Sequence, residues 1–328
     1  MTQTTCFAPL PVATQDDGTP RRVGFELEFS GVTLREAVEA MRDALGGTAA
    51  KSSAAEWTLE VESLGIFNIE LDWDYLKRKA AKSEEEEPDE EWLEHLSRAA
   101  ALLVPVEVVC PPIDVDDLDR LAPMTAALRE AGAVGTEESL IAAYGVHVNT
   151  ESPSLEAATV AAYLRAFGLL QWWLVDHHEV DATRRISPYI DLFPETYVAL
   201  VLGRSEDTID TLFDDYLKHN ATRNRALDLL PLLAEIDPDR VRRTIDDPRI
   251  KARPTFHYRL PDCRIERDDW SLAGAWTGWL VVERLANQPD ELARLGEAFL
   301  DAARPLLGVR RKHWVETMDA WVRDHASA

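Results

Sequence analysis

The chain has 328 residues, of which 46% are hydrophobic, and a formal net charge of −24. A chain of this length and apolar content can bury a sizeable core, and no apolar run approaches the length of a membrane span. The negative charge argues against a broad nucleic-acid surface and against adsorption to anionic lipid, because both need a basic patch. We therefore expect small-molecule partners rather than nucleic acid or a membrane, and oligomer formation stays open.

The N-terminus lacks the basic start and the long apolar stretch of a signal peptide. The three cysteines, Cys6, Cys110 and Cys263, are too few and too scattered for a disulfide framework. Both features predict a cytoplasmic protein. Residues 1–20 show no periodicity, so we interpret them as a loose arm before a single domain that spans residues 21–328 and is helical from about residue 270.

Strand patterns dominate the first half of the chain. Residues 22–29 alternate polar and apolar side chains, and Thr33 then caps a helix that ends before Gly46. The acidic run at 83–91 is typical of a solvated loop or helix face. The other predicted elements of this half are strands at 57–62, 67–71, 105–109 and 144–150, and helices at 92–103 and 115–130.

Helical patterns dominate the second half. Ser152 and Pro153 open a long helix towards His177, because proline is tolerated in a first turn. Further helices are predicted at 195–202, 205–219, 225–235, 272–287, 289–303 and 310–325, with one strand at 255–260. Short strands with polar faces favour a half-solvated, largely antiparallel sheet packed by helices, so we predict an α+β fold with a helix-rich C-terminal half.

Polar side chains of three strands form a candidate metal site. Residues i and i+2 of a strand point the same way, about 6.5 Å apart, so Glu26 and Glu28 share one face, as do His147 and Asn149. Glu107 lies between two valines of a third strand. A solvent-exposed Glu or a hydrogen-bonded structural His explains each residue taken alone. If the strands are neighbours, the carboxylates repel one another unless cations or protons neutralise them.

Arginines cluster in the second half and offer candidate anion contacts. Arg184 and Arg185 are adjacent, Arg225 lies in a basic turn, and His257 and Arg259 share one strand face. A guanidinium fork binds phosphate or carboxylate, although salt bridges to the many acidic residues explain the same pattern. The chain has neither a G-x-G-x-x-G nor a Walker pattern, so any nucleotide must be held by other means.

Five runs taken together resemble one family. They are R-x-G-x-E-x-E-F, V-E-V-V-C-P-P, Y-G-V-H-V-N, R-N-R-A-L-D-L and F-H-Y-R-L, in chain order. This set resembles the amidoligases, relatives of glutamine synthetase and glutamate–cysteine ligase in the carboxylate–amine ligase superfamily. The resemblance runs from about residue 22 to about residue 276 and is strongest in the first three runs.

The resemblance implies an antiparallel sheet whose concave face holds ATP and Mg²⁺, with Mn²⁺ as a second choice. It implies that a carboxylate attacks the γ-phosphate of ATP, and that an amine then displaces phosphate from the acyl phosphate to leave an amide. An amino acid or a small peptide-like carboxylate is the expected substrate. A weakened relative that only binds nucleotide or peptide stays open, as does a metal-dependent phosphotransferase or hydrolase on the same fold.

The resemblance also implies roles for individual residues, position by position. The metal ligands are Glu26, Glu28, Glu107, His147 and His257; the ATP contacts are Asn149, Arg225 and Arg259; the catalytic residues are Arg259, Arg225 and His147; and Glu62 is a substrate contact. Apart from the resemblance, Arg184 and Arg185 are candidate substrate contacts because they follow His177 and His178 and could line the cleft.

Two positions depart from the family pattern. His257 stands where relatives carry a glutamate, which weakens one Mg²⁺ position or favours a softer ion, unless Glu266 replaces it. Asp228 stands where relatives favour asparagine. These departures motivate the hypothesis of a weakened relative.

Overall fold

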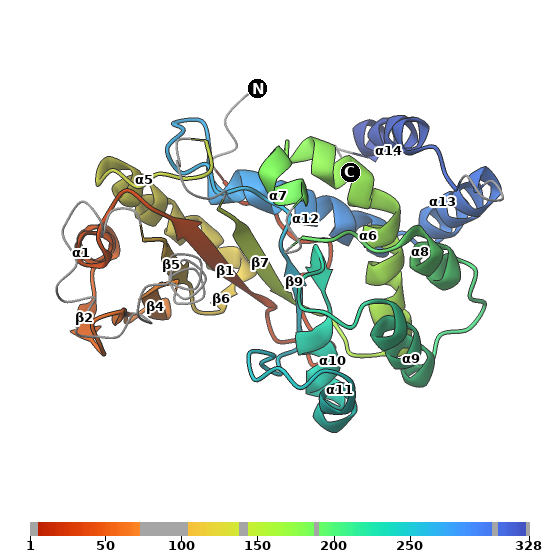
Figure 1. Ribbon diagram of the computed structural model, residues 1–328, viewed down its shortest axis with the longest axis horizontal. Helices are drawn as coiled ribbons and strands as arrows, with labels where there is room; N and C mark the ends of the chain where they lie inside the picture. Colours follow the sequence, from red (N-terminus) through yellow and green to blue (C-terminus); the bar gives the residue numbers. More distant parts are fainter. Residues whose placement is uncertain (1–5, 73–103, 138–143, 187–189, 304–307, 326–328) are drawn as a thin grey trace, which may run out of the picture. The chain divides into compact units, whose positions relative to one another are not determined.

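The computed structural model describes residues 6–72, 104–137, 144–186, 190–303 and 308–325. In these ranges the protein is an α+β structure with an open antiparallel sheet and eleven α-helices (Figure 1). None of the helices in the described ranges is long and apolar enough to cross a membrane. The chain forms two compact units: the first holds residues 1–7, 22–148 and 261–275, and the second holds residues 8–21, 149–260 and 276–328.

The first unit is built on antiparallel strands. Their spatial order is β2 (Thr48–Lys51), β3 (Glu56–Val61), β4 (Gly65–Leu71), β5 (Val106–Val109), β1 (Arg22–Phe29) and β7 (Val146–Glu151). The short strand β6 (Ile113–Asp114) pairs with the beginning of β1. The chain passes into the second unit within β7, after Val148.

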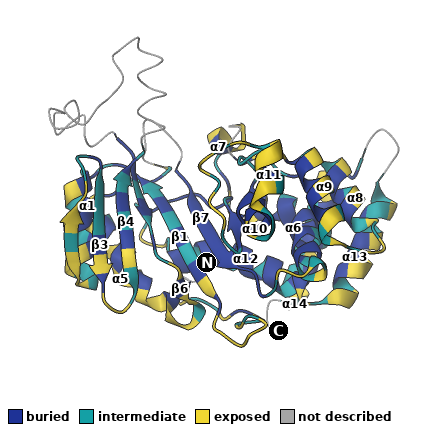
Figure 2. Cartoon of the chain, turned by 90° about the horizontal axis from the view of Figure 1, so that it is seen from below, coloured by how far each residue is buried: buried dark blue, intermediate teal, exposed yellow. Residues whose placement is uncertain are grey.

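One face of this sheet is apolar because each strand alternates. In β1, Val23, Phe25, Leu27 and Phe29 are fully buried, while most of the residues between them are half-buried (Figure 2). Helix α1 (Leu34–Leu45) packs on β3 and β4, and also on α5 (Ala122–Glu130). The polar residues of the strands therefore lie on the opposite face of the sheet.

The second unit is mainly helical. Its long helix α6 (Ala157–His177) contacts α8 (Glu195–Leu202), α9 (Ile209–His219), α13 (Pro289–Ala302) and α14 (Arg311–His325). The strands β8 (Leu227–Asp228) and β9 (Thr255–Tyr258) pair antiparallel, and α10 (Leu230–Ile236) packs on β9. The unit is completed by α7 (Ala182–Ile186), α11 (Pro238–Thr244) and most of α12 (Leu272–Ala286).

Most predicted elements are confirmed to within a few residues, and three differ for local reasons. The predicted helix at 225–235 is the strand β8 followed by α10, because the Asp228 Oδ1 accepts the Leu230 N–H and turns the chain. Helix α6 begins only at Ala157, after a turn in which the Ser152 hydroxyl donates to the Ser154 carbonyl. The segment 115–130 is a 3₁₀ turn (Val115–Leu121) that leads into α5. The helix predicted at 92–103 and the acidic run at 83–91 lie outside the described residues.

A buried ion pair joins three parts of the second unit. Arg21 and Glu283 have fully buried side chains, with Nη2 and Oε1 2.7 Å apart. The Arg21 Nε also donates to the Glu151 carbonyl at 2.8 Å. The Glu283 carboxylate further accepts from the Trp279 indole N–H at 2.9 Å and from the Tyr163 hydroxyl. Buried charges are tolerated only when paired and hydrogen-bonded, and this pair meets both conditions.

We expect Arg21→Met to destabilise the protein by about 3–5 kcal/mol, because it leaves the buried Glu283 carboxylate without its cation. Urea unfolding followed by tryptophan fluorescence measures this loss. Arg242→Met is the matched control, since Arg242 makes an exposed ion pair with Asp239 in the same unit and should cost less than about 1 kcal/mol. Equal losses in the two variants would show that the buried pair has no special weight.

Candidate functional site

Strand register in the first unit places four glutamates directly opposite one another. Glu28 of β1 is the cross-strand partner of Glu107 of β5, Glu107 is the partner of Glu70 of β4, and Glu70 is the partner of Glu56 of β3. We call Glu28, Glu107, Glu70 and Glu56 the glutamate row. Side chains in such positions have Cβ atoms about 4.5–5.5 Å apart, where like charges destabilise a sheet.

The glutamate row forms because polar and apolar residues alternate along each strand, and the register places the polar positions of neighbouring strands opposite one another. Val106 and Val108 are fully buried on either side of Glu107, and Ile69 is fully buried next to Glu70. Burial of these apolar neighbours in the core turns the glutamates to the other face of the sheet. The sequence predicted Glu28 and Glu107 there but missed Glu70 and Glu56. The signal for Glu70 was the same alternation in the strand at 67–71, whereas Glu56 lies one residue before the strand predicted at 57–62.

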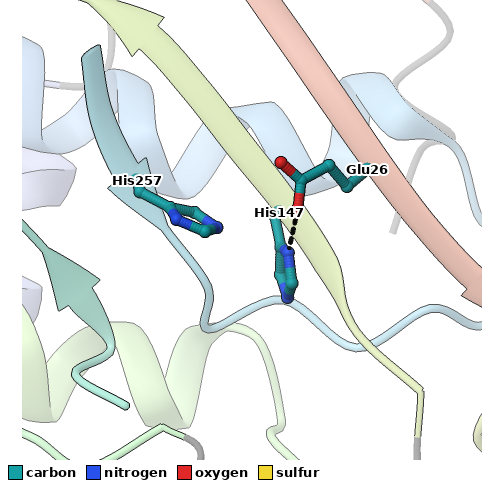
Figure 3. A group of neighbouring side chains, drawn as sticks. All are labelled: Glu26, His147 and His257. Carbon is teal, nitrogen blue, oxygen red and sulfur yellow. Dashed lines mark hydrogen bonds and ion pairs between the residues drawn. The ribbon is translucent and has the colours of Figure 1, made fainter. Parts of the chain in front are cut away.

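The next strand, β7, adds a histidine to this face. The His147 Nδ1 lies 2.6 Å from the Glu26 Oε2 (Figure 3). Glu28 is tied to the residue before β7 twice, because its N–H donates to the Gly145 carbonyl at 3.1 Å and its Oε2 accepts the Gly145 N–H at 3.0 Å. A carboxylate bonded to one ring nitrogen fixes the orientation of the imidazole, as in many metal sites.

Crowding of these carboxylates changes their protonation. Burial first, and then the charges of Glu26, Glu28, Glu70 and Asp72, raise the pKa of Glu107 well above its ordinary value. Burial, followed by the nearby Glu56, Asp72 and Glu26, also raises the pKa of Glu70. Uptake of a proton or binding of a cation relieves this repulsion.

This donor set fits a hard divalent cation. Carboxylate oxygens are the ligands that Mg²⁺ and Mn²⁺ prefer, and an imidazole is compatible with Mn²⁺. Within the first unit, Glu26, Glu28, Glu107 and His147 come together as the sequence predicted, and Glu70 joins them.

Two other acidic candidates of this unit lie elsewhere. Glu62 is exposed in the turn between β3 and β4. The turn ends at Gly65, and Glu70 lies five residues further along β4, or roughly 17 Å at the usual rise of a strand. Glu62 is therefore far from the glutamate row. Glu266 accepts the N–H groups of Gly135 and Glu137 at 3.0 and 2.8 Å, so its carboxylate holds a loop.

In the second unit, a buried carboxylate lies opposite His257. Asp228 of β8 pairs in register with His257 of β9 and is 2% exposed. Burial raises the pKa of Asp228 to about 7, although the Leu230 N–H and the guanidinium groups of Arg259, Arg223 and Arg253 act in the opposite direction. Three arginines of the second unit therefore act on the charge of one buried acid.

Of the arginines that the sequence predicted as ligand contacts in this unit, two bond to the backbone and one is exposed. Arg225 donates to the carbonyls of Leu192 and His219 at 2.8 and 3.0 Å. Arg184 is buried and donates to the carbonyls of Arg259 and Leu260, both at 2.9 Å. Both guanidinium groups therefore brace the backbone, whereas Arg185 is exposed.

Arg259 and Asn149 each bond to another arginine of this unit. The Arg259 Nη1 donates to the Arg223 carbonyl at 2.5 Å, and the Asn149 Oδ1 accepts from the Arg253 Nη2 at 3.1 Å. Our sequence analysis missed Arg253. The signal was present, because residues 253, 255, 257 and 259 continue one period-two face through Pro254.

A family model described as "putative amidoligase enzyme" matches residues 19–281, which is most of the chain. No curated protein and no solved structure gave a significant match.

The raised pKa of Glu107 predicts a pH-dependent stability in metal-free protein. Its folded form keeps the proton at pH values where the unfolded chain has lost it, so stability falls as the pH rises above the ordinary carboxyl pKa towards the folded one. We expect Glu107→Gln to flatten this decline in thermal unfolding measured in EDTA. Glu60→Gln, an exposed change on β3, is the control and should keep the wild-type slope. A slope that survives Glu107→Gln would contradict the assignment.

Proposed function

The chain belongs to the amidoligase family, and from this premise we propose that it is an ATP-dependent carboxylate–amine ligase that works through an acyl phosphate. The observation that carries the proposal is the convergence of Glu26, Glu28, Glu107 and His147 on one sheet face of the first unit. We further propose a sheet like that of glutamine synthetase and an amino acid or small peptide-like carboxylate as substrate. A cytoplasmic location and small-molecule partners, without nucleic acid or membrane, complete the proposal.

The carboxylates of the first unit would hold Mg²⁺ or Mn²⁺. When bound, such an ion would neutralise the charge that develops in phosphoryl transfer. Glu26, Glu28 and Glu107 are the proposed ligands, with Glu70 beside them. A rigid antiparallel sheet suits this task, because cross-strand register sets the spacing of its ligands.

His147 would act through its bond to Glu26. The Glu26 carboxylate orients the ring through its bond to Nδ1. A charged imidazole can contact a phosphate oxygen, and a neutral one can present its other nitrogen to a metal. Either use positions the phosphate against the attacking carboxylate, and alignment of two reactants lowers a barrier by several kcal/mol.

Residues of the second unit would supply positive charge. Arg259 and Asn149 are the proposed ATP contacts, and Arg259 would stabilise the transferred phosphate. Arg225 and Arg184 donate to backbone carbonyls, so we propose that they contribute by holding that backbone in place. Arg185 and Glu62 remain candidate substrate contacts. His257 remains a proposed metal ligand on the strength of the family resemblance.

His257 favours one alternative function. Where relatives carry a glutamate, this chain offers an imidazole, and a neutral ligand holds Mg²⁺ less tightly than a carboxylate does. The alternative is a nucleotide-binding relative without turnover. It differs from the ligase only in the chemical step, so an assay of that step separates the two.

The ligase proposal predicts ADP formation that depends on a carboxylate substrate. We expect incubation with ATP, Mg²⁺ and pooled amino acids to release ADP and phosphate, and hydroxylamine to trap the acyl phosphate as a hydroxamate. Nucleotide binding without ADP would support the alternative. Phosphate release that needs no amine would indicate a hydrolase, and a phosphorylated amine would indicate a phosphotransferase.

We expect Glu26→Gln to lower the ADP rate by at least about 100-fold, because it replaces a charged ligand by a neutral amide and weakens the bond that orients His147. Glu60→Gln removes the same charge from an exposed site of the same sheet and should keep the rate. Thermal unfolding checks that both variants fold. A Glu26→Gln enzyme with near-normal turnover would rule out this metal site.

A further inference from the structure

We propose that His178 is a positioning residue of the proposed ligase, because its hydrogen bond to Tyr258 holds the strand that carries His257 and leads into Arg259. The inference rests on the proposed function for its catalytic meaning. His178 and Tyr258 have no role in the proposals above, and the contacts that support this one all lie within the second unit.

Tyr258 alternates with two proposed site residues along the chain. It is the last residue of β9, and the Arg259 N–H continues the pairing by donating to the Ala226 carbonyl at 2.9 Å. Successive residues of a strand point to opposite faces, so Tyr258 lies on the face opposite to His257 and Arg259. Tyr258 is fully buried, and its ring centre is 5.7 Å from that of Trp279. A shift of this buried residue therefore moves the backbone that places its two neighbours.

The hydroxyl of Tyr258 meets an imidazole at the end of α6. The His178 Nε2 lies 2.6 Å from the hydroxyl oxygen, the distance of a short hydrogen bond. His178 is the C-cap of this helix, and Glu179 follows it with a φ of 48°. The Val180 N–H donates to the Val175 carbonyl at 3.1 Å, as in a Schellman motif, where glycine is the usual residue at the left-handed position. Because this chain carries a glutamate there, surrounding contacts must hold the end of the helix in place.

Helix α12 approaches the pair so closely that a residue larger than glycine would displace the imidazole. A Cβ atom at Gly278 would lie 2.2 Å from the His178 Nε2 and 3.1 Å from the Tyr258 hydroxyl oxygen. The hydroxyl oxygen of the preceding residue, Thr277, lies 3.3 Å from the His177 Nε2. Two adjacent histidines of α6 therefore contact two adjacent residues of α12, and α6, α12 and β9 meet at the imidazole of His178.

A second contact holds the same end of the strand. Arg184, six residues after His178, is buried and donates to the carbonyls of Arg259 and Leu260, both at 2.9 Å. The segment 178–184 thus bonds to the side chain of Tyr258 and to the backbone of the two residues that follow it. Together these contacts fix where the strand ends and how it is turned. Such precision matters in an enzyme, because a displacement of about 1 Å can lower a rate roughly 100-fold.

A hydrogen bond in the core also stabilises the fold, so stability alone does not test a positioning role. Tyr258→Phe removes only the hydroxyl that meets His178. Tyr163→Phe is the matched control, because it removes another buried tyrosine hydroxyl of the same unit, one that donates to the Glu283 carboxylate. We expect both variants to lose stability in urea unfolding, and only Tyr258→Phe to alter β9.

Hydrogen–deuterium exchange of the full-length protein measures the effect on the strand. After correction for the change in global stability, we expect the amides of residues 255–260 to exchange at least about fivefold faster in Tyr258→Phe and at the wild-type rate in Tyr163→Phe. In the ADP assay with ATP, Mg²⁺ and pooled amino acids, we expect Tyr258→Phe to lower kcat by at least about tenfold with little change in the KM for ATP, because alignment acts on the transition state. Tyr163→Phe should keep both constants.

Variants on the other side of the bond separate its loss from a loss of packing. His178→Gln keeps a hydrogen-bonding group at a similar reach and should recover most of the wild-type kcat, whereas His178→Leu should match Tyr258→Phe. The double variant His178→Leu/Tyr258→Phe should lose no more than either single variant, because the two side chains act as one contact. Gly278→Ala favours the helix but displaces the imidazole, so it should lower kcat as Tyr258→Phe does.

Four results would overturn the proposal. They are unchanged exchange at residues 255–260 in Tyr258→Phe, faster exchange there without a fall in kcat, an equal fall in kcat in Tyr163→Phe, and a His178→Gln enzyme no better than His178→Leu. A wild type that forms no ADP would reject the ligase proposal instead. Faster exchange in Tyr258→Phe alone would then still keep His178 as the residue that holds β9, and unchanged exchange would reject both.

Discussion

Electrostatic repulsion among the four glutamates of the glutamate row is the constraint that gives the first unit its character. Directly opposed like charges cost free energy, and the apolar residues on the other face of the same strands offset it. A one-residue slip of the register would relieve the repulsion but would place those carboxylates in the core. Burial of Val106, Val108 and Ile69 therefore keeps the glutamates together, ready for a cation.

The second unit contains buried charged groups in two different settings. Arg21 and Glu283 are fully buried, and their bonds join the N-terminal arm, β7 and α12. Their charges are matched, so the pair contributes to structure. At Asp228, burial raises the pKa to about 7, although the Leu230 N–H and three guanidinium groups act in the opposite direction. In the first unit the glutamates repel one another, and a cation would relieve that repulsion.

The sequence allowed much of the local structure to be predicted. Period-two alternation predicted β1, β3, β4 and β5, and Thr33 with Glu36 forms the capping box at the start of α1. The same alternation put Glu26 and Glu28 on one face. It did not reveal Glu70, because a glutamate in a strand with a polar face is ordinary until its cross-strand partner is known. Arg225 was predicted to bind a ligand, and only the fold shows that its guanidinium braces two carbonyls.

The sequence by itself determined which side chains share a strand face and which family the chain resembles, because alternation and motif order are local properties. The tertiary structure alone decided which strands are neighbours and in what register. Those pairings set the separation of charges that are remote along the chain, and electrostatic interactions depend on that separation. For this reason Glu28, Glu107 and Glu70 lie side by side across three strands, and Asp228 lies opposite His257.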